Sequence, residues 1–317
     1  MAFANVSDLI TTTLEDRSSD IADNVTENDA FLFTLNKKGN VRTFSGGRII
    51  YEPLSFAENP NGGSYSGYDI LPTGPADVIS AAEFSIKQYA VPVSCSGLEE
   101  LQNMGKNQVI DLVEGRVNVA KSTIRNLLEA GLFSDGTGNG GKDLVGLDAA
   151  VAASPSTGTY GGINRATYSF WRNQTNTVTI TASNAVGELT ELYASCTRMN
   201  DTPNLVLAGG TVWAFYMAQL QALQRFSDPD LANAGFANVL FMNAPMVLCG
   251  GIGGSATATN FYMLNTKYLH WRPHSSRNMV PLKKRDSFNQ DASVVPLVWA
   301  GALTCSGARF QGRLIGA

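Results

Sequence analysis

The segment from Asn40 to Gly97 constrains this chain most, because it predicts a long β-rich arm that cannot bury itself. Two extended runs, Val41–Phe56 and Tyr68–Leu71, flank a tip rich in Pro, Asn and paired Gly, which is typical of a hairpin loop. An isolated two-stranded arm is marginally stable in water. We therefore expect its apolar side chains to pack on another copy of the chain: Ile49, Ile50, Tyr51, Leu54, Phe56, Tyr65 and Tyr68.

The low charge content favours the same interpretation. The chain has 317 residues, enough for one large or two small domains, but only 16% of them are charged, against about 25% in typical soluble domains. Partners could therefore cover much of its surface. A net charge of −4 argues against a nucleic-acid coat built on Lys and Arg. No apolar run approaches the ~20 residues of a membrane span, and the N-terminus lacks a signal-peptide pattern.

The N-terminal segment is acidic. Residues 1–30 carry seven acidic side chains and one basic side chain, Arg17, so we expect a draped arm that is poorly suited to binding DNA. The alternation of Phe31, Phe33 and Leu35 then predicts a short strand.

A long strand and a long helix follow the arm. Val78–Ser96 alternates as a strand, with a phase slip at Lys87–Gln88 that predicts a bulge and a proline, Pro92, that predicts an edge position. Ser96–Glu99 fits a capping box. Apolar residues at helical spacing predict a helix from Asn107 to Ala130, about 36 Å long at 1.5 Å per residue.

The second half predicts a compact α/β region over residues 151–285. We expect helices at 185–199 and, capped by Thr211, at 211–226, and strands at 205–208, 239–242, 246–248, 261–264 and 268–272. The last strands, 294–304 and 308–315, are predicted to return to the long helix.

Glycine-rich segments offer two nucleotide-binding patterns, and neither has its expected context. Gly136–Lys142 fits a phosphate-binding loop, but a helix precedes it and Asp143 follows the lysine where Ser or Thr is needed. The same loop partly mimics a calcium loop but has Gly146 at the twelfth position, where a bidentate Glu is required. Gly251–Ala256 resembles a dinucleotide turn without the later acidic residue. We interpret all three as connecting loops.

The remaining reactive residues form no recognisable site. Pro273 interrupts the spacing of His270 and His274. Lys283–Arg285 is a short basic run that we assign to a solvated loop rather than to a DNA contact. The cysteines contain no Cys-x-x-Cys pair and are interpreted as reduced thiols: Cys95, Cys196, Cys249 and Cys305. We therefore expect no catalytic, cofactor-binding or metal-binding residues and no enzyme activity.

Taken together, several segments resemble the major capsid proteins of tailed bacteriophages. The resemblance rests on residues 46–59, 65–71, 75–103, 131–151, 157–174 and 299–316. It implies an α+β architecture, the HK97-like capsid fold. In that fold residues 1–35 would be an N-terminal arm, 36–73 an extended loop, 74–150 with 286–317 a peripheral domain containing the long spine helix, and 151–285 a mixed α/β axial domain.

The resemblance also implies a function and partners. Such proteins assemble as hexamers and pentamers into an icosahedral shell that encloses double-stranded DNA without sequence-specific binding. The implied partners are scaffolding, portal and decoration proteins, with no membrane, and the implied location is the virion capsid, assembled in the bacterial host cytoplasm. The short segment before the loop, starting at Met1, favours a separate scaffolding protein. A nanocompartment shell of the same fold and a nucleotide-binding enzyme built on Gly136–Lys142 are the alternatives.

Overall fold

The computed structural model describes residues 29–102, 106–220, 229–233, 238–249, 260–283, 285–286 and 290–316. Its helices are α3 Ala30–Lys37, α4 Gly97–Gln102, α5 Lys106–Leu132, α6 Gly138–Gly141, α7 Leu147–Ala150, α8 Ala185–Cys196, α9 Gly210–Gln219 and α10 Pro229–Asn233, with the single 3-10 turns η1 Ser169–Trp171, η2 Thr266–Tyr268 and η3 Ala308–Phe310. Its strands are β1 Ile49–Ser55, β2 Ile79–Ser85, β3 Lys87–Ser96, β4 Thr159–Tyr160, β5 Ile163–Asn164, β6 Gln174–Val178, β7 Leu205–Ala208, β8 Asn238–Phe241, β9 Ala244–Leu248, β10 Asn260–Leu264, β11 Leu269–Pro273, β12 Val280–Pro281, β13 Arg285–Asp286, β14 Ala292–Cys305 and β15 Gly312–Gly316.

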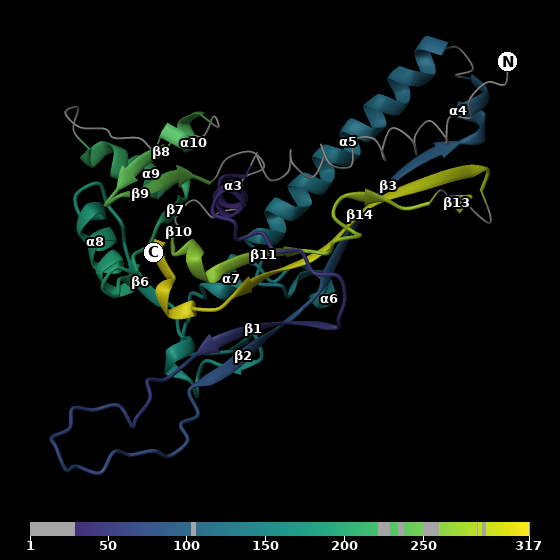
Figure 1. The fold of residues 1–317 in the computed structure, drawn as a ribbon. Helices are drawn as coiled ribbons and strands as arrows, with labels where there is room; N and C mark the ends of the chain where they lie inside the picture. The colour runs from purple at the N-terminus through teal and green to yellow at the C-terminus, as the bar shows by residue number, and fades with distance from the viewer. Residues whose placement is uncertain are drawn as a thin grey trace.

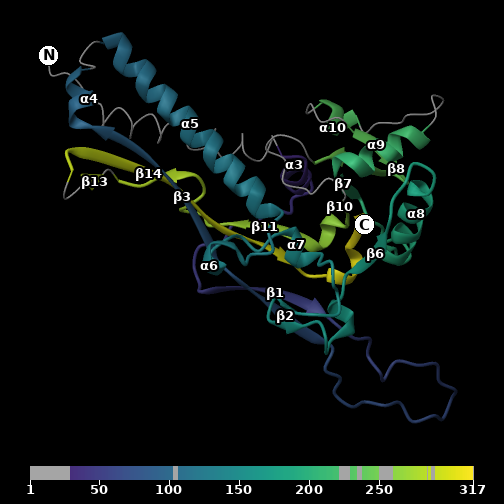
Figure 2. The same cartoon turned by 180° about the vertical axis from the view of Figure 1, so that it is seen from behind.

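The molecule is elongated, with a projection at each end (Figure 1). At one end α5 lies along a ribbon made by β3 and β14, and at the other the loop between β1 and β2 extends away from the body. The view from behind shows the same two projections (Figure 2). The body of the molecule contains the sheet that includes β6, β7 and β10.

Strand β14 is the axis of a five-stranded sheet. Its residues 292–301 pair antiparallel with β3, while β11, β12 and β13 pair along its other edge. Pro92 of β3 lies opposite Pro296. A proline removes a ladder donor and is tolerated on edge strands, and β14 is the only strand that pairs with β3 in the described part of the chain. The edge position predicted from Pro92 is confirmed.

The six-stranded sheet has the order β6-β15-β10-β7-β9-β8 and a core on each face. In β7, Val206 and Ala208 pack with α8 and α9, whereas Leu205 and Leu207 belong to the larger core shared with α3, α5 and β14. Strand residues point alternately to opposite faces, so one apolar strand serves both cores. The larger core therefore joins the two sheets.

Helix α5 confirms the predicted long helix and extends it slightly at each end. Its 27 residues span about 40 Å at 1.5 Å per residue. Val117, Ala120, Ile124 and Leu128 are buried at helical spacing. The capping box is also confirmed, since the N–H of Ser96 donates to Glu99 Oε2 (3.1 Å) and the N–H of Glu99 to Ser96 Oγ (3.3 Å). It starts the short α4.

The strand predicted at Phe31–Leu35 is wrong, because these residues lie in helix α3. The Asp29 carboxylate caps the helix by accepting from the N–H groups of Phe31 (2.7 Å) and Leu32 (3.0 Å). Phe31, Leu32 and Leu35 are buried on the side of α3 that faces the core. The acidic N-terminal segment itself lies outside the described residues.

The arm also pairs differently from the prediction. The partner of β1 is β2, with Ile49 opposite Ser85 and Ser55 opposite Ile79, rather than Tyr68–Leu71. The phase slip near Lys87 is not a bulge within one strand. It marks the point at Ile86 where the chain leaves the β1–β2 sheet and enters the β3–β14 sheet.

Three further predictions need correction. Residues 308–315 do not return to the long helix, because β15 pairs with β10 and β6 in the six-stranded sheet. The strand predicted at 268–272, expected within the α/β region, is β11, which pairs instead with β14. The short strand β12, which was not predicted, also pairs with β14. Helix α9 is capped at Gly209 rather than Thr211, with no side-chain cap bond.

We predict that Ile124→Ala lowers the free energy of unfolding by about 3 kcal/mol, because Ile124 is fully buried where α5 meets the core and a cavity would remain. Urea unfolding of the dissociated subunit measures the effect. Val119→Ala, on the exposed side of the same helix, is the control and should change it by less than about 0.5 kcal/mol. Equal losses in the two variants would contradict the assigned helix orientation.

Candidate assembly surface

The base of the arm is packed on its own chain. Ile50 and Leu54 of β1 are buried, and the ring of Phe56 lies 5.4 Å from that of Phe170. The prediction that these three side chains need a second copy is therefore wrong. Tyr51 alternates to the opposite face and is 58% exposed. The β1–β2 hairpin thus covers the body with one face and leaves the other open.

An ion pair beneath the hairpin fixes it to the five-stranded sheet. Glu52 is only 3% exposed. Its Oε1 accepts from Arg272 Nε (2.8 Å) and Thr304 Oγ1 (2.8 Å), and it pairs with a second guanidinium nitrogen of Arg272. Buried His270 lies nearby, and burial lowers the pKa of its imidazole while the Glu52 carboxylate opposes that shift. Three strands, β1, β11 and β14, thereby meet at one carboxylate.

Sequence reasoning missed Glu52 as a structural residue. The signal was present, because Glu52 has the same strand parity as Ile50 and Leu54 and therefore points to the same buried face. A carboxylate at such a position requires a partner cation. The sequence did not indicate which of the arginines would supply it.

Beyond the hairpin, residues 57–78 form the projecting loop. Its large apolar side chains are exposed, including Tyr65 (66%), Tyr68 (105%) and Ile70 (95%). The loop holds its shape through local polar contacts, such as Asn61 Nδ2 donating to the Gly74 carbonyl (2.6 Å). It contains three acidic residues and no basic residue. A large exposed apolar surface of this kind marks an interaction site.

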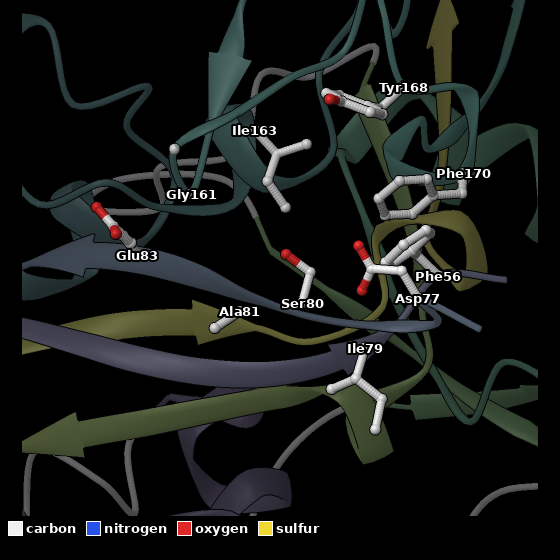
Figure 3. Close-up of a pocket in the computed structure, with 11 residues that line it drawn as sticks. Phe56, Asp77, Ile79, Ser80, Ala81, Glu83, Gly161, Ile163, Tyr168 and Phe170 are labelled. Atoms are coloured by element: carbon white, nitrogen blue, oxygen red, sulfur yellow. The ribbon is translucent and has the colours of Figure 1, made fainter. Parts of the chain in front are cut away.

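A groove of about 420 Å³ runs along the free edge of β2. Phe56 N–H donates to the Val78 carbonyl (3.1 Å) and Glu83 N–H to the Gly161 carbonyl (2.9 Å). Backbone groups alternate in direction along a strand, so those of Ile79 and Ala81 face outward, and no strand pairs with them in the described part of the chain. Figure 3 shows Glu83 and Gly161 at one end of this groove and Phe56, Asp77 and Phe170 at the other.

A larger groove, of about 740 Å³, lies between α5 and the β3–β14 ribbon. Its lining is mostly apolar and includes Val91, Val93 and Val119. Arg116 reaches across it, pairing with Glu99 Oε1 (2.6 Å) and donating to the Ser94 carbonyl. Hydrogen bonds from Arg116 and the Ser96 backbone lower the pKa of Glu99 to about 2. The groove therefore offers apolar surface beside a fixed ion pair.

The glycine-rich loop does not have the structure of a phosphate-binding loop. Gly138–Gly141 forms the single turn α6, with positive φ at Asn139 (49°) and Gly140 (67°). The Asp143 carboxylate lies directly against Gly138, where it would repel a phosphate group. Gly251–Ala256 lies outside the described residues.

The histidines and the basic run are separated in the structure. His270 is buried in β11, whereas the His274 ring lies beside Phe44 with its centroid 5.0 Å away. Lys283 and Arg285 lie on the exposed edge of the ribbon. Among the described residues there is no group of three or more His, Cys, Asp or Glu that could hold a metal ion. Nor does that part of the chain contain a helix long and apolar enough to cross a membrane.

The fold is similar to those of phage capsid proteins. The cyanophage A-1(L) capsid asymmetric unit matches with a TM-score of 0.67 at 16% identity, covering 88% of this chain and 91% of that chain. A capsid chain of an empty GTA particle matches with a TM-score of 0.55 at 11% identity, covering 90% of each chain. The capsid of Myoviridae phage XM1 matches with a TM-score of 0.52 at 14% identity, covering 89% of this chain and 92% of that chain.

No protein-family model matches the sequence, and no curated protein has a similar sequence. The similarity is therefore one of fold. It covers 88–90% of this chain in these three matches.

We predict that Glu52→Gln destabilises the subunit by about 3 kcal/mol, because it leaves the largely buried Arg272 without its carboxylate. The free energy of unfolding in urea measures this. Glu58→Gln is the matched control, because Glu58 forms an ion pair with Arg198 on the surface. The Glu58 side chain is 88% exposed and that of Arg198 64% exposed, and exposed ion pairs contribute at most about 1 kcal/mol to stability. A smaller loss for Glu52→Gln than for Glu58→Gln would show that Glu52 does not anchor the arm.

Proposed function

We propose that this chain is the major capsid protein of a tailed phage and assembles into hexamers and pentamers of an icosahedral shell around double-stranded DNA. The main support is the fold shared with capsid proteins over 88% of the chain, together with a loop whose apolar side chains have no covering surface of their own. The protein's role in this proposal is structural, with no catalysis and no cofactor.

The two projections suggest how neighbouring subunits meet. The loop 57–78 of one subunit would lie in the groove between α5 and β3 of the next, where its Tyr and Ile side chains cover apolar lining residues and its acidic residues approach Arg116. Such a contact joins different surfaces of the two copies. Contacts of this type close into rings when the rotation between subunits permits it, which suits pentamers and hexamers.

Many modest contacts would hold the shell together. Each subunit would give one loop and receive another, and repeated contacts in a closed lattice reinforce each other without any single one being strong. Gly62 and Gly63 at the loop tip give it the conformational freedom to fit five-fold and six-fold surroundings.

The domain division remains part of the proposal. Residues 1–35 would be the N-terminal arm, 36–73 the extended loop, 74–150 with 286–317 the peripheral domain, and 151–285 the axial domain. The strand pairing described above crosses these limits at β11, β12 and β15.

The enclosed DNA would be held without sequence-specific contacts. The 27 Asp and Glu residues outnumber the 23 Lys and Arg residues, so the chain has no excess of positive charge for neutralising phosphates. Scaffolding, portal and decoration proteins complete the proposed set of partners, and the proposed location is the virion capsid after assembly in the host cytoplasm.

We predict that deleting Asn59–Ser66 leaves a folded subunit that assembles poorly, because this loop makes few contacts with its own chain. Circular dichroism and thermal unfolding check the fold, and electron microscopy counts closed shells. Replacing the same eight residues by a Gly/Ser segment of equal length is the control for loop length, and it should also assemble poorly. Normal shells from the deletion variant would show that the loop is not needed between subunits.

We predict that the mature shell contains no covalent links between subunits. A lysine–asparagine isopeptide bond from the loop would need a lysine there. Residues 39–71 contain none, and their only basic residues are Arg42 and Arg48, whose guanidinium groups stay protonated and are poor nucleophiles. Lys37 and Lys38 lie at the base of the extended loop, at the end of α3, where Lys37 pairs with Asp230 of its own chain, so we expect them to lie too far from a neighbour's peripheral domain to react. Boiled, reduced particles should run on a denaturing gel as one band near 33.8 kDa. A ladder of multimers that survives reductant is the contrary result.

A further inference from the structure

The chain crosses between the six-stranded and the five-stranded sheet at two places that lie side by side. It passes from β10 to β11 through residues 265–268, and from β14 to β15 through residues 306–311. The rings of Tyr268 and Phe310, one from each crossing, stack 4.5 Å apart, and Ser306 N–H donates to the Tyr268 carbonyl (2.9 Å). Any change in the angle between the sheets must therefore deform this junction.

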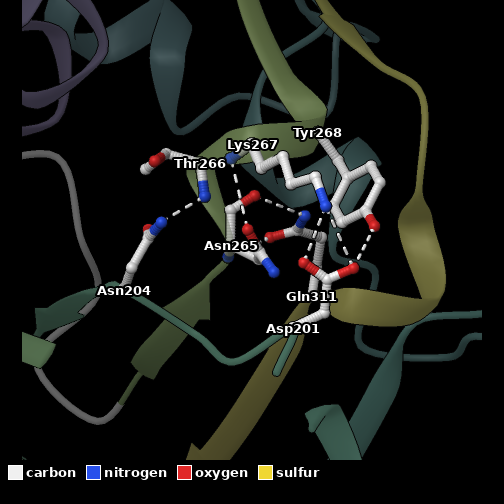
Figure 4. Close-up of polar contacts among 7 residues, drawn as sticks. All are labelled: Asp201, Asn204, Asn265, Thr266, Lys267, Tyr268 and Gln311. Carbon is white, nitrogen blue, oxygen red and sulfur yellow. Dashed lines mark hydrogen bonds and ion pairs between the residues drawn. The ribbon is translucent and has the colours of Figure 1, made fainter. Parts of the chain in front are cut away.

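One buried side-chain amide, that of Gln311, connects the crossings directly through the backbone of Asn265. Gln311 is 0% exposed and Asn265 1% exposed. The N–H of Asn265 donates to Gln311 Oε1 (2.9 Å), and Gln311 Nε2 donates to the carbonyls of Asn265 (3.1 Å) and Gly307 (3.4 Å). One glutamine side chain thus bridges both crossings, as Figure 4 shows.

Three further segments form hydrogen bonds with the first crossing, residues 265–268. Asn204, just before β7, accepts from Thr266 N–H through its Oδ1 (3.0 Å), and its own N–H donates to the Leu264 carbonyl (2.9 Å). Asn40, which lies between α3 and β1, donates through Nδ2 to the Thr266 carbonyl (2.6 Å). At the exposed rim, Asp201 accepts from Lys267 Nζ (2.9 Å) and the Tyr268 hydroxyl (2.6 Å).

The polar character of this junction matters because the larger core, which also joins the sheets, consists of apolar side chains. The larger core joins them through side chains such as Leu207, Tyr262 and Leu303. Apolar contact is non-directional and favours burial without selecting an angle. Hydrogen bonds from a buried amide hold only over a narrow range of distance and direction. The core therefore holds the sheets together, while the junction selects their relative orientation.

We propose that the four junction residues Asn204, Asn265, Thr266 and Gln311 set the curvature of the assembled shell by fixing the angle between the two sheets. The inference rests on the proposed function. The five-stranded sheet carries both the β3–β14 ribbon and, through Glu52 and Arg272, the hairpin that holds the projecting loop. A small rotation at the junction therefore turns the ribbon and the loop together relative to the six-stranded sheet, and this changes the direction in which the subunit meets its neighbours. A rigid junction gives every subunit the same shape, and the adjustment between five-fold and six-fold surroundings falls to the loop 57–78.

The test compares particle diameters made from full-length variants. Gln311→Met keeps the side-chain volume close to that of glutamine but removes the bridge between the crossings. Shells are assembled from the full chain with its assembly partners, well below the unfolding midpoint of each variant, and measured by electron microscopy. We expect wild type to give one diameter and Gln311→Met to give several diameters or open, irregular sheets.

Two controls separate curvature from stability. Leu189→Ala opens a cavity in the core between α8 and the six-stranded sheet, a core that contains none of the four junction residues, and should give fewer shells of the wild-type diameter. Lys267→Ala removes only the exposed rim contact and should leave both yield and diameter unchanged. If Leu189→Ala gives the same mixture of diameters as Gln311→Met, loss of stability explains the effect and the inference is wrong.

The remaining outcomes are also decisive. If Gln311→Met does not fold, Asn204→Ala takes its place in the measurement of shell diameter. This substitution removes the Oδ1 acceptor for the Thr266 N–H. A single wild-type diameter from whichever variant folds would overturn the role of the junction while leaving the proposed function intact. If wild type itself forms no closed shell with its partners, the proposed function fails and this inference fails with it.

Discussion

The pairing of β14 with β3 is the interaction on which the rest of the structure depends. Ten consecutive residue pairs join these strands, from Ala292–Ser96 to Gly301–Lys87, and the far edge of β14 carries β11, β12 and β13. Helix α5 packs along β3, and β14 leads directly to β15 in the other sheet. This extended ribbon leaves a long groove open between α5 and the strands β3 and β14.

The apolar surface of the arm is divided between a buried base and an exposed tip. Its base, β1 and β2, packs on the body through Ile50 and Leu54 and is fixed by the Glu52–Arg272 ion pair. Its tip turns Tyr65, Tyr68 and Ile70 to solvent. In the proposed shell, the anchored base would direct the loop toward a neighbouring subunit and prevent it from folding back on its own chain.

Sequence reasoning predicted the elements with long, regular patterns. Helix α5 followed from apolar residues at helical spacing, and the Ser96–Glu99 capping box from its local sequence. It failed where a short pattern had two explanations. The alternation of Phe31, Phe33 and Leu35 suggested a strand, yet Asp29 followed by apolar residues 31, 32 and 35 fits a capped helix equally well. The β1–β2 pairing was missed because β2 and β3 adjoin and were interpreted as one strand.

The polar contacts that connect distant segments could not be predicted. Glu52 pairs with Arg272, which is 220 residues away in the sequence, and Gln311 bonds to Asn265, which is 46 residues away. Such partners depend on how the sheets pack, and no local pattern encodes that packing. The exposure of the tip was nevertheless predicted from composition, since the tip combines hairpin-loop residues with apolar side chains that its own length cannot cover.

Cryo-electron microscopy of the full-length protein assembled with its partners tests the central claim most directly. The account predicts closed icosahedral shells in which residues 57–78 of each subunit lie in the groove between α5 and β3 of a neighbour. A protein that stays monomeric at high concentration in every salt condition with its scaffold supplied would contradict it, as would shells in which this loop touches no other subunit.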